Sequence, residues 1–262
     1  MELWILFGSF VGLLVLGTPI AFCLAISSLF TILYMGMPPV IVVQRLNSGI
    51  SAFALLAIPF FIYAGDVMVR GGIAEKLVRL AASMVGHMRG GLGQVNIVAS
   101  TMFGGVSGSA VADASAVGGL MIPQMKKRGY DVDYAVNITS VGAIIALLIP
   151  PSHNMIIYSI SAGGVISIAD LFTAGVIPGL MLAASLMVAG YWVARRRGYP
   201  AEVFPGWRNI GPILLNAIPG ILLIAIIFGG VRSGIFTATE SSCIALIYAL
   251  LTPWREIALI RD

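Results

Sequence analysis

Two short interruptions in a very apolar chain place oxygen-bearing groups where a cation could bind. The first, Ser107-Gly108-Ser109, lies in the stretch GGVSGSAVADASAVGGLMIP at 104–123, and the second is Pro150-Pro151-Ser152. Serine hydroxyls are hard oxygen ligands, which suit Na⁺. Each proline lacks a backbone N–H, so the pair frees carbonyl groups upstream, around Ala146 and Leu147. Unwound carbonyls at helix breaks coordinate Na⁺ in secondary transporters, and the two breaks therefore predict an ion site.

The main alternative is that the small residues only allow helices to pack closely. Close packing accounts for residues 110–119, but it does not explain why two breaks occur. Asp113 follows the first break by one turn, and a carboxylate at membrane depth is a functional candidate by default. Its place near a helix N-terminus favours a role in capping or in a polar network over direct ligation of the ion.

A second alternative is an intramembrane serine protease. The sequence GVSG at 105–108 matches the G-x-S-G pattern of rhomboid-type proteases, with Ser107 as nucleophile and His153 as base. Such a short pattern is common by chance in glycine-rich membrane chains. His153 also follows directly after the proline pair rather than lying on a packed helix that would fix its ring beside the serine. We therefore expect a protein that is not an enzyme.

The composition indicates an integral membrane protein made of helices. The chain is 59% hydrophobic and only 10% charged, with a mean hydropathy of +1.00. Apolar runs near the length needed to span a bilayer recur along it, and they lack the alternation of a transmembrane barrel. The net charge of +4 is read as a topology signal rather than as a surface that binds nucleic acid. Cys23 and Cys243 lie in apolar runs and are expected to be buried and free.

Glycine, proline and basic residues divide the chain into apolar segments. We expect these at 3–16, 19–36, 51–69, 91–105, 109–125, 134–149, 154–163, 166–194, 210–230 and 234–252, with a connector at 37–50. Residues 73–88 place apolar side chains on one helical face and charged ones on the other. This pattern is typical of an amphipathic helix that lies along the membrane surface.

The basic residues predict how the segments cross the membrane. If Lys126-Lys127-Arg128 is cytoplasmic, Arg195-Arg196-Arg197 is also cytoplasmic when the intervening segments cross out and back. The basic residues of 70–89 join them only if 91–125 enters and leaves through the same face. The positive-inside rule therefore favours a re-entrant hairpin with its tip at Ser107-Gly108-Ser109.

Three motifs together resemble the large membrane subunit of tripartite ATP-independent periplasmic (TRAP) transporters. They are FGGVSGSAVADASAVGGLMIPQMKKRGYD at 103–131, IPPSHNMIIYS at 149–159 and GGVRSGIFTATESS at 229–242, and the likeness runs from near Met1 to about Leu251. The resemblance implies an all-α polytopic protein of the bacterial inner membrane, with an elevator-type fold of inverted repeats, a re-entrant helical hairpin and a discontinuous helix. It also implies Na⁺-driven import of a small organic anion, such as a C4-dicarboxylate, sialic acid or another carboxylic acid. The implied partners are a periplasmic solute-binding protein and a small four-helix membrane subunit.

The family's first Na⁺ site is carried over by the matching motifs, and no organic cofactor is expected. By resemblance, the metal ligands are the side chains of Ser107 and Ser109 and the carbonyls of Ala146, Ile149 and Pro151; Gly108, Ser152 and Asn154 lie near the substrate; and Asp113, Pro150 and Glu240 have structural or coupling roles. Ala146 stands where glycine is expected, and TATES at 237–241 replaces the usual T-P-T-E-A. His153 is also less usual after P-P-S.

The resemblance divides the chain into family regions. These are scaffold helices at 1–72, an arm helix at 73–90, the re-entrant hairpin at 91–128, transport-domain helices at 129–198 with their break at 150–152, and the start of the second-repeat scaffold at 199–262. The family continues past Asp262 with a second hairpin, so we expect that this chain does not transport by itself. A truncated, non-transporting scaffold fragment and a different ion-coupled transporter of similar architecture remain as alternatives.

Overall fold

The computed structural model describes residues 1–202 and 206–259, and it divides into two compact units, Met1–Ala52 and Phe53–Asp262. Residues 203–205 and 260–262, which belong to the predicted second-repeat segment, lie outside the described part. Every regular element in the described ranges is helical, and the one β-bridge there pairs Arg89 with Ala201. The prediction of an all-α membrane protein is confirmed.

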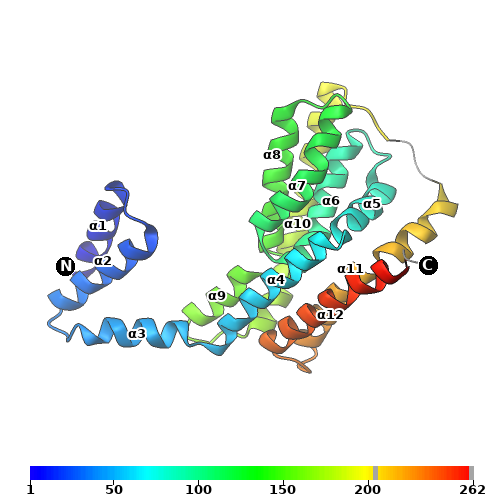
Figure 1. Cartoon of the computed structure of the whole chain (residues 1–262). Helices are drawn as coiled ribbons and strands as arrows, with labels where there is room; N and C mark the ends of the chain where they lie inside the picture. Colours follow the sequence, from blue (N-terminus) through cyan, green and yellow to red (C-terminus); the bar gives the residue numbers. More distant parts are fainter. Residues whose placement is uncertain (203–205, 260–262) are drawn as a thin grey trace. The chain divides into compact units, whose positions relative to one another are not determined.

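The first unit contains α1 (Glu2–Val15), α2 (Ile20–Tyr34) and α3 (Val40–Ile50). Helices α1 and α2 pack against each other (Figure 1). Between them Gly17 has a φ of 78° and Pro19 is the N-cap of α2, so the predicted break lies where glycine and proline stop one helix and start the next. The expected connector at 37–50 is wrong in part, because residues 40–50 are helical. Pro39 is the N-cap of α3, a position where its missing N–H costs no hydrogen bond.

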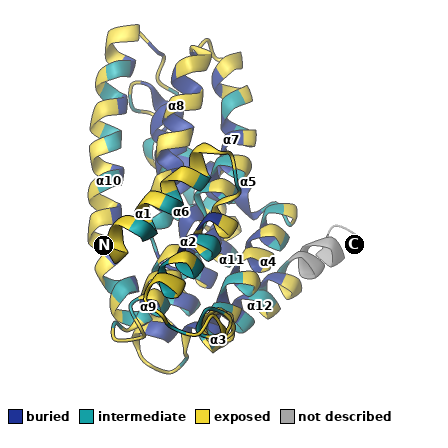
Figure 2. Ribbon diagram, turned by 90° about the vertical axis from the view of Figure 1, so that its left-hand side faces the viewer, coloured by how far each residue is buried: buried dark blue, intermediate teal, exposed yellow. Residues whose placement is uncertain are grey.

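The second unit is a bundle of helices with one central member. Its elements are η1 (Phe53–Leu56), α4 (Ala57–Arg70), α5 (Ile73–Val85), α6 (Gly91–Ser107), α7 (Ala110–Lys127), α8 (Val132–Ala143), η2 (Ile144–Leu147), α9 (His153–Ser161), α10 (Ile168–Arg197), α11 (Trp207–Arg232) and α12 (Ala238–Leu259). Helix α6 contacts α5, α7, α8 and α10 and is buried along most of its length (Figure 2). Helices α4, α11 and α12 pack together beside it (Figure 1). Because α6 packs against several neighbours, these neighbours fix the position of its C-terminal end at Ser107.

Three helices in the described ranges are long and apolar enough to cross a membrane: Phe53–Arg70, Ile168–Arg197 and Ile210–Arg232. Most of their residues are not buried inside the unit, which fits helices that face lipid. Four shorter apolar helices, Glu2–Val15, Ile20–Tyr34, Val132–Leu147 and Ala238–Thr252, complete the apolar set. The break after Leu147 ends Val132–Leu147 within the predicted apolar segment 134–149, so this segment does not continue into α9 as one long helix.

Helix α5 is amphipathic, and protein covers most of its apolar face. Ile73 and Leu77 are buried and lie close to Gly220 of α11, where an added Cβ would come within 3.0 Å of Ile73 and 3.2 Å of Leu77. Glu75 and Arg79 are exposed on the opposite face. The apolar stripe predicted from the sequence is therefore used to pack α5 against α6 and α11. Its orientation along the membrane surface stays a prediction.

Residues 198–202 form hydrogen bonds with the connection 86–90. They lie at the basic end of the bundle, which carries the basic clusters 126–128 and 195–197. The N–H of Gly90 donates to the carbonyl of Pro200 at 3.2 Å, and the N–H of Glu202 donates to that of Gly86 at 3.0 Å. The rings of Tyr130 and Tyr199 lie 4.4 Å apart, and the Tyr130 hydroxyl donates to Pro200 at 3.1 Å. Burial raises the pKa of both phenols. These contacts link the C-terminal ends of α5, α7 and α10 to one another.

Arg197 fastens the end of α10 to the start of α8. Its guanidinium lies 2.9 Å from the Asp131 carboxylate and 3.0 Å from that of Asp133. Tyr199 donates to the same Asp131 carboxylate at 2.7 Å. This arrangement satisfies the planar guanidinium from two sides, which lysine could not do.

Candidate functional site

The first break is a tight turn between two helices. Helix α6 ends at Ser107, Gly108 follows with a φ of 59°, and Ser109 is the extended N-cap of α7. Glycine is favoured at the middle position because side chains are strained at positive φ. The Ser109 hydroxyl accepts from the N–H of Ala112 at 3.4 Å, and the N–H of Ser109 points to the Ser107 hydroxyl at 3.5 Å. Both serine side chains are thus held at the tip by local backbone geometry.

The second break interrupts the chain between η2 and α9. Pro150 and Pro151 are joined by a cis peptide bond and cannot donate to the carbonyls of Ala146 and Leu147. The Ser152 hydroxyl donates to the Leu147 carbonyl at 2.7 Å and so replaces one of the lost donors. Ser152 itself is buried. The prolines therefore release the carbonyl of Ala146, as the sequence predicts, while that of Leu147 is satisfied again.

The tip and the break lie against each other. A Cβ on Gly108 would lie 2.0 Å from the carbonyl oxygen of Pro151, and a Cβ on Gly104 would lie 2.7 Å from the Cα of Ala146. The N–H of His153 points to the carbonyl of Gly108 at 3.4 Å. Backbones approach this closely only where glycine leaves room. The fold thus brings together the two interruptions that the sequence places more than forty residues apart.

The N-termini of two helices meet at the same place. Ser109 starts α7 and Ser152 starts α9, and the contact between Gly108 and Pro151 joins these starts. The positive ends of helix dipoles and their unpaired N–H groups favour bound anions. Asn154, in the first turn of α9, is exposed. The arrangement combines oxygen atoms that suit a cation with helix ends that suit a carboxylate.

A family model described as "Tripartite ATP-independent periplasmic transporter, DctM component" matches residues 7–254, which include both breaks. The chain belongs to this family. Members of the DctM family are transporter permeases, so this chain is a transporter component rather than an enzyme. His153 Nε2 is buried and has no hydrogen-bond partner among the described residues.

Three relatives show the breadth of the DctM family. The chain is 40% identical over 251 residues to the 2,3-diketo-L-gulonate TRAP transporter large permease protein YiaN of Escherichia coli. It is 34% identical over 262 residues to the C4-dicarboxylate TRAP transporter large permease protein DctM of Rhodobacter capsulatus, and 41% identical over 240 residues to the sialic acid TRAP transporter large permease protein SiaM of Vibrio cholerae. These matches cover 95%, 95% and 91% of this chain, but only 59%, 60% and 56% of the respective relatives. The chain therefore spans less than two thirds of the length of these permeases.

Asp113 belongs to a buried group of polar side chains in this DctM chain. The sequence motifs did not reveal the other members of this group. Its carboxylate is fully buried in the first turns of α7, with the side chain of Ser100 on α6 close to it. Asn96 and Ser100 on α6 are fully buried as well, and Asn96 donates to Thr139 of α8 at 2.6 Å. The spacing of Asn96 and Ser100 by one helical turn is the sequence signal that could have found them. Ser109, not Asp113, supplies the side-chain cap of α7.

Glu240 has a local partner. Its carboxylate accepts from the N–H of Thr237 at 2.8 Å and from the Thr237 hydroxyl at 2.9 Å, and that hydroxyl accepts from the N–H of Glu240 at 3.3 Å. This is a capping box, in which two side chains satisfy the free donors at a helix start. These contacts assign Glu240 a structural part at the start of α12, and any coupling role stays a prediction.

The side-chain set does not resemble a transition-metal site. Within the described ranges no group of three or more His, Cys, Asp or Glu residues lies close enough to hold a metal ion. The oxygens at the tip and the break are hydroxyl and carbonyl groups, which hard cations accept. The predicted ligand residues Ser107, Ala146 and Pro151 are all buried, whereas Ile149 and Ser109 are half-buried.

Proposed function

We propose that this chain forms part of a Na⁺-coupled secondary transporter of the bacterial inner membrane that imports small organic anions. The observation that carries the proposal is the contact between the hairpin tip at Gly108 and the proline break at Pro151. The tip carries two serine hydroxyls, and the proline pair leaves the Ala146 carbonyl without its helical donor. Broken helices that meet in this way bind coupling ions and anionic substrates in other transporter folds.

We assign the Na⁺ ligands to the hydroxyls of Ser107 and Ser109 and to the carbonyls of Ala146, Ile149 and Pro151. The close approach of Gly104 to Ala146 and of Gly108 to Pro151 supports this grouping. Ions of this kind bind where several oxygens replace water, and neutral oxygens suffice for a monovalent cation. Na⁺ would move with the substrate as a coupling ion.

The substrate we propose is a carboxylic acid such as a C4-dicarboxylate or sialic acid. The named relatives are permeases for a diketogulonate, for C4-dicarboxylates and for sialic acid. In this chain the N-termini of α7 and α9 meet beside Gly108 and Ser152, and bound Na⁺ would add positive charge there. Exposed Asn154 would contact the substrate from the first turn of α9.

The complete transporter would need further parts. We infer that a periplasmic solute-binding protein delivers the anion and that a small four-helix membrane subunit extends the scaffold. An elevator motion would carry the segment 91–198 relative to scaffold helices arranged as inverted repeats. The chain covers 59% of one permease relative, so the alternative of a non-transporting scaffold fragment is tested in parallel.

Na⁺-specific stabilisation of the purified chain in detergent tests the ion site. Thermal unfolding in NaCl is compared with unfolding in choline chloride of equal ionic strength. A Na⁺ concentration tenfold above its dissociation constant should stabilise the chain by about 1.4 kcal/mol. The double variant Ser107→Ala/Ser109→Ala should lose this difference. The control Ser28→Ala/Ser185→Ala removes two hydroxyls that bond to carbonyls of their own helices, and it should keep the difference.

Uptake of a radiolabelled dicarboxylate tests transport. The complete permease is reconstituted in liposomes with both partners, and Na⁺ dependence is measured for the parent and for Ser107→Ala/Ser109→Ala. An unchanged Na⁺ dependence in the double variant would overturn the ligand assignment. Na⁺ binding by the chain without uptake by the complete assembly would favour the scaffold alternative.

A further inference from the structure

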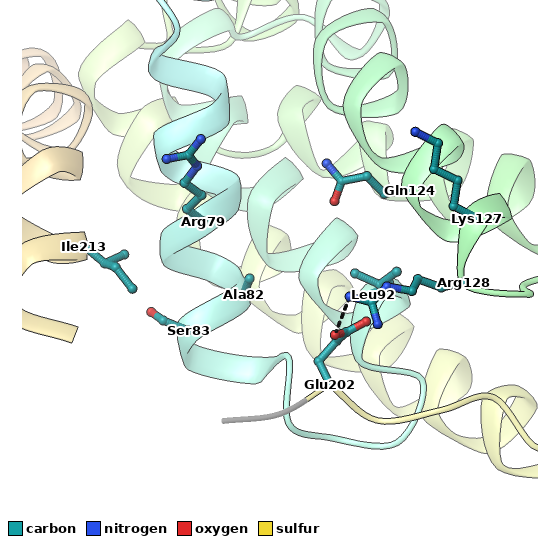
Figure 3. A pocket seen from close by; sticks show the side chains of 9 residues that line it. All are labelled: Arg79, Ala82, Ser83, Leu92, Gln124, Lys127, Arg128, Glu202 and Ile213. Atoms are coloured by element: carbon teal, nitrogen blue, oxygen red, sulfur yellow. Dashed lines mark ion pairs between the residues drawn. The ribbon is translucent and has the colours of Figure 1, made fainter. Parts of the chain in front are cut away.

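We propose that the cavity between α5, α6, α7 and α11 binds the headgroup of an anionic phospholipid. The cavity has a volume of about 480 Å³, and Figure 3 shows the side chains that line it. Its lining comes from four helices, from Arg128 directly after α7 and from Glu202 in the connection after α10. This site lies apart from the candidate ion site, because none of its lining residues belongs to 107–109 or 150–152.

Three basic side chains line the cavity: Arg79 from α5, Lys127 from the end of α7 and Arg128 directly after it. Glu202 is the acidic residue among the lining side chains, so three positive charges face one negative charge. The surplus is not neutralised locally. Arg79 is 4.0 Å from Glu75, with both side chains largely exposed, and Lys127 forms no ion pair within the described ranges. A phosphate group would therefore find uncompensated positive charge.

One contact inside the cavity limits this charge. Arg128 lies 3.4 Å from Glu202, and Figure 3 marks this ion pair with a dashed line. The backbone of Glu202 is fixed by its hydrogen bond to the Gly86 carbonyl at 3.0 Å. Its carboxylate therefore competes with any anion for Arg128. Removal of the Glu202 charge should therefore strengthen anion binding. If Glu202 only supported the fold, its replacement would weaken binding instead.

Apolar side chains form the rest of the wall and point to a lipid rather than to a soluble phosphate. Ala82 of α5, Leu92 of α6 and Ile213 of α11 line the same cavity as the three cations. A hydrated inorganic anion gains nothing from such surfaces, whereas the glycerol and first acyl carbons of a lipid are buried favourably against them. Basic pockets between membrane helices bind lipid headgroups in this manner.

The surroundings of the cavity also place it at headgroup depth. The connections 86–90 and 198–202 are hydrogen-bonded to each other at this end. Helix α10 ends here with Arg196 stacked 3.6 Å from the centre of the Trp192 ring. Tryptophan and arginine mark the membrane–water interface, and clustered basic residues mark its cytoplasmic side, where the anionic lipids lie.

Native mass spectrometry of the intact chain in detergent tests this proposal. Phosphatidylglycerol, phosphatidylcholine and inorganic phosphate are added separately at equal concentration. We expect the chain to retain phosphatidylglycerol in preference to phosphatidylcholine, and inorganic phosphate neither to bind nor to displace the lipid. Each basic side chain near an anionic lipid strengthens binding roughly fivefold, so Arg79→Gln/Lys127→Gln should weaken retention roughly 25-fold.

Two further variants make the test specific. Lys126→Gln/Arg195→Gln removes the same charge from exposed positions outside the cavity and should change retention little. Glu202→Gln should increase retention, because Arg128 loses its competitor. The proposal is overturned if the cavity variant and its matched control weaken retention equally, if Glu202→Gln weakens it, or if inorganic phosphate displaces the lipid.

Discussion

Gly108 allows the tip of the hairpin to touch the proline break, and its replacement should separate them. Gly108 has a φ of 59°, and an added Cβ would lie 2.0 Å from the Pro151 carbonyl oxygen. A side chain in the left-handed conformation costs about 1–2 kcal/mol. Non-bonded carbon and oxygen atoms stay more than about 3 Å apart. The backbones at Gly108 and Pro151 must therefore also separate by roughly 1 Å. We expect Gly108→Ala to lower the free energy of unfolding by at least about 3 kcal/mol.

Two other glycines separate the two contributions. Gly72 also has a positive φ, of 75°, but an added Cβ would meet nothing within 4 Å. Gly72→Ala should therefore show the conformational cost alone, about 1–2 kcal/mol. Gly119 lies inside α7 with ordinary φ and open space around its Cα, so Gly119→Ala should stabilise the chain by about 0.5–1 kcal/mol.

Denaturant titration in detergent micelles, followed by tryptophan fluorescence, measures all three variants. The reasoning predicts the order Gly119→Ala most stable, then the parent, Gly72→Ala and Gly108→Ala. A Gly108→Ala variant no less stable than Gly72→Ala would show that Pro151 does not press on the tip. In that case the candidate ion site would lose its main geometric support.

Three more predictions concern other parts of the chain. Thr237→Ala removes the hydroxyl of the capping box at the start of α12 and should destabilise the chain by about 1 kcal/mol in the same titration, while Ser185→Ala on α10 should be neutral. Arg197→Gln removes the ion pairs to Asp131 and Asp133 and should lower the thermal midpoint at low salt, with a smaller loss at high salt; Arg195→Gln is the matched control, and equal effects would contradict the role of Arg197. Because burial raises the pKa of Tyr130 and Tyr199, the unfolded chain releases these protons first, so stability should fall as the pH rises above about 10. Tyr130→Phe/Tyr199→Phe should flatten this decline, and an unchanged slope would show that the two phenols do not cause it.

Local signals in the sequence predict the helices well. Glycine and proline mark where α1, α6 and η2 end, because one permits positive φ and the other removes a donor. The prediction at 37–50 was wrong in part for a related reason. A proline pair can begin a helix as well as break one, and the residues that follow decide whether a helix forms. The helical periodicity of the sequence predicted the apolar stripe of α5. It did not predict what the stripe packs against, since lipid and protein cover such a stripe equally well.

The polar contacts inside the bundle were harder to predict. Asn96 and Ser100 belong to no known motif, and the hydrogen bond from Asn96 to Thr139 depends on how α6 and α8 are rotated against each other. The capping partner of Glu240 lies three residues away and could be predicted from the T-x-x-E spacing alone. Contacts within one helix turn follow from sequence, whereas contacts between helices require the packing.

The sequence by itself determined that this is a helical membrane protein of the DctM family with breaks at 107–109 and 150–152, because composition, turn residues and motifs are local properties of the chain. Only the tertiary structure decided that the two breaks touch, that glycines at 104 and 108 permit the approach, and that Arg79, Lys127 and Arg128 surround one cavity. Those facts depend on distances between residues far apart in the chain, and such distances are set by the packing of α6 against its neighbours rather than by any single segment.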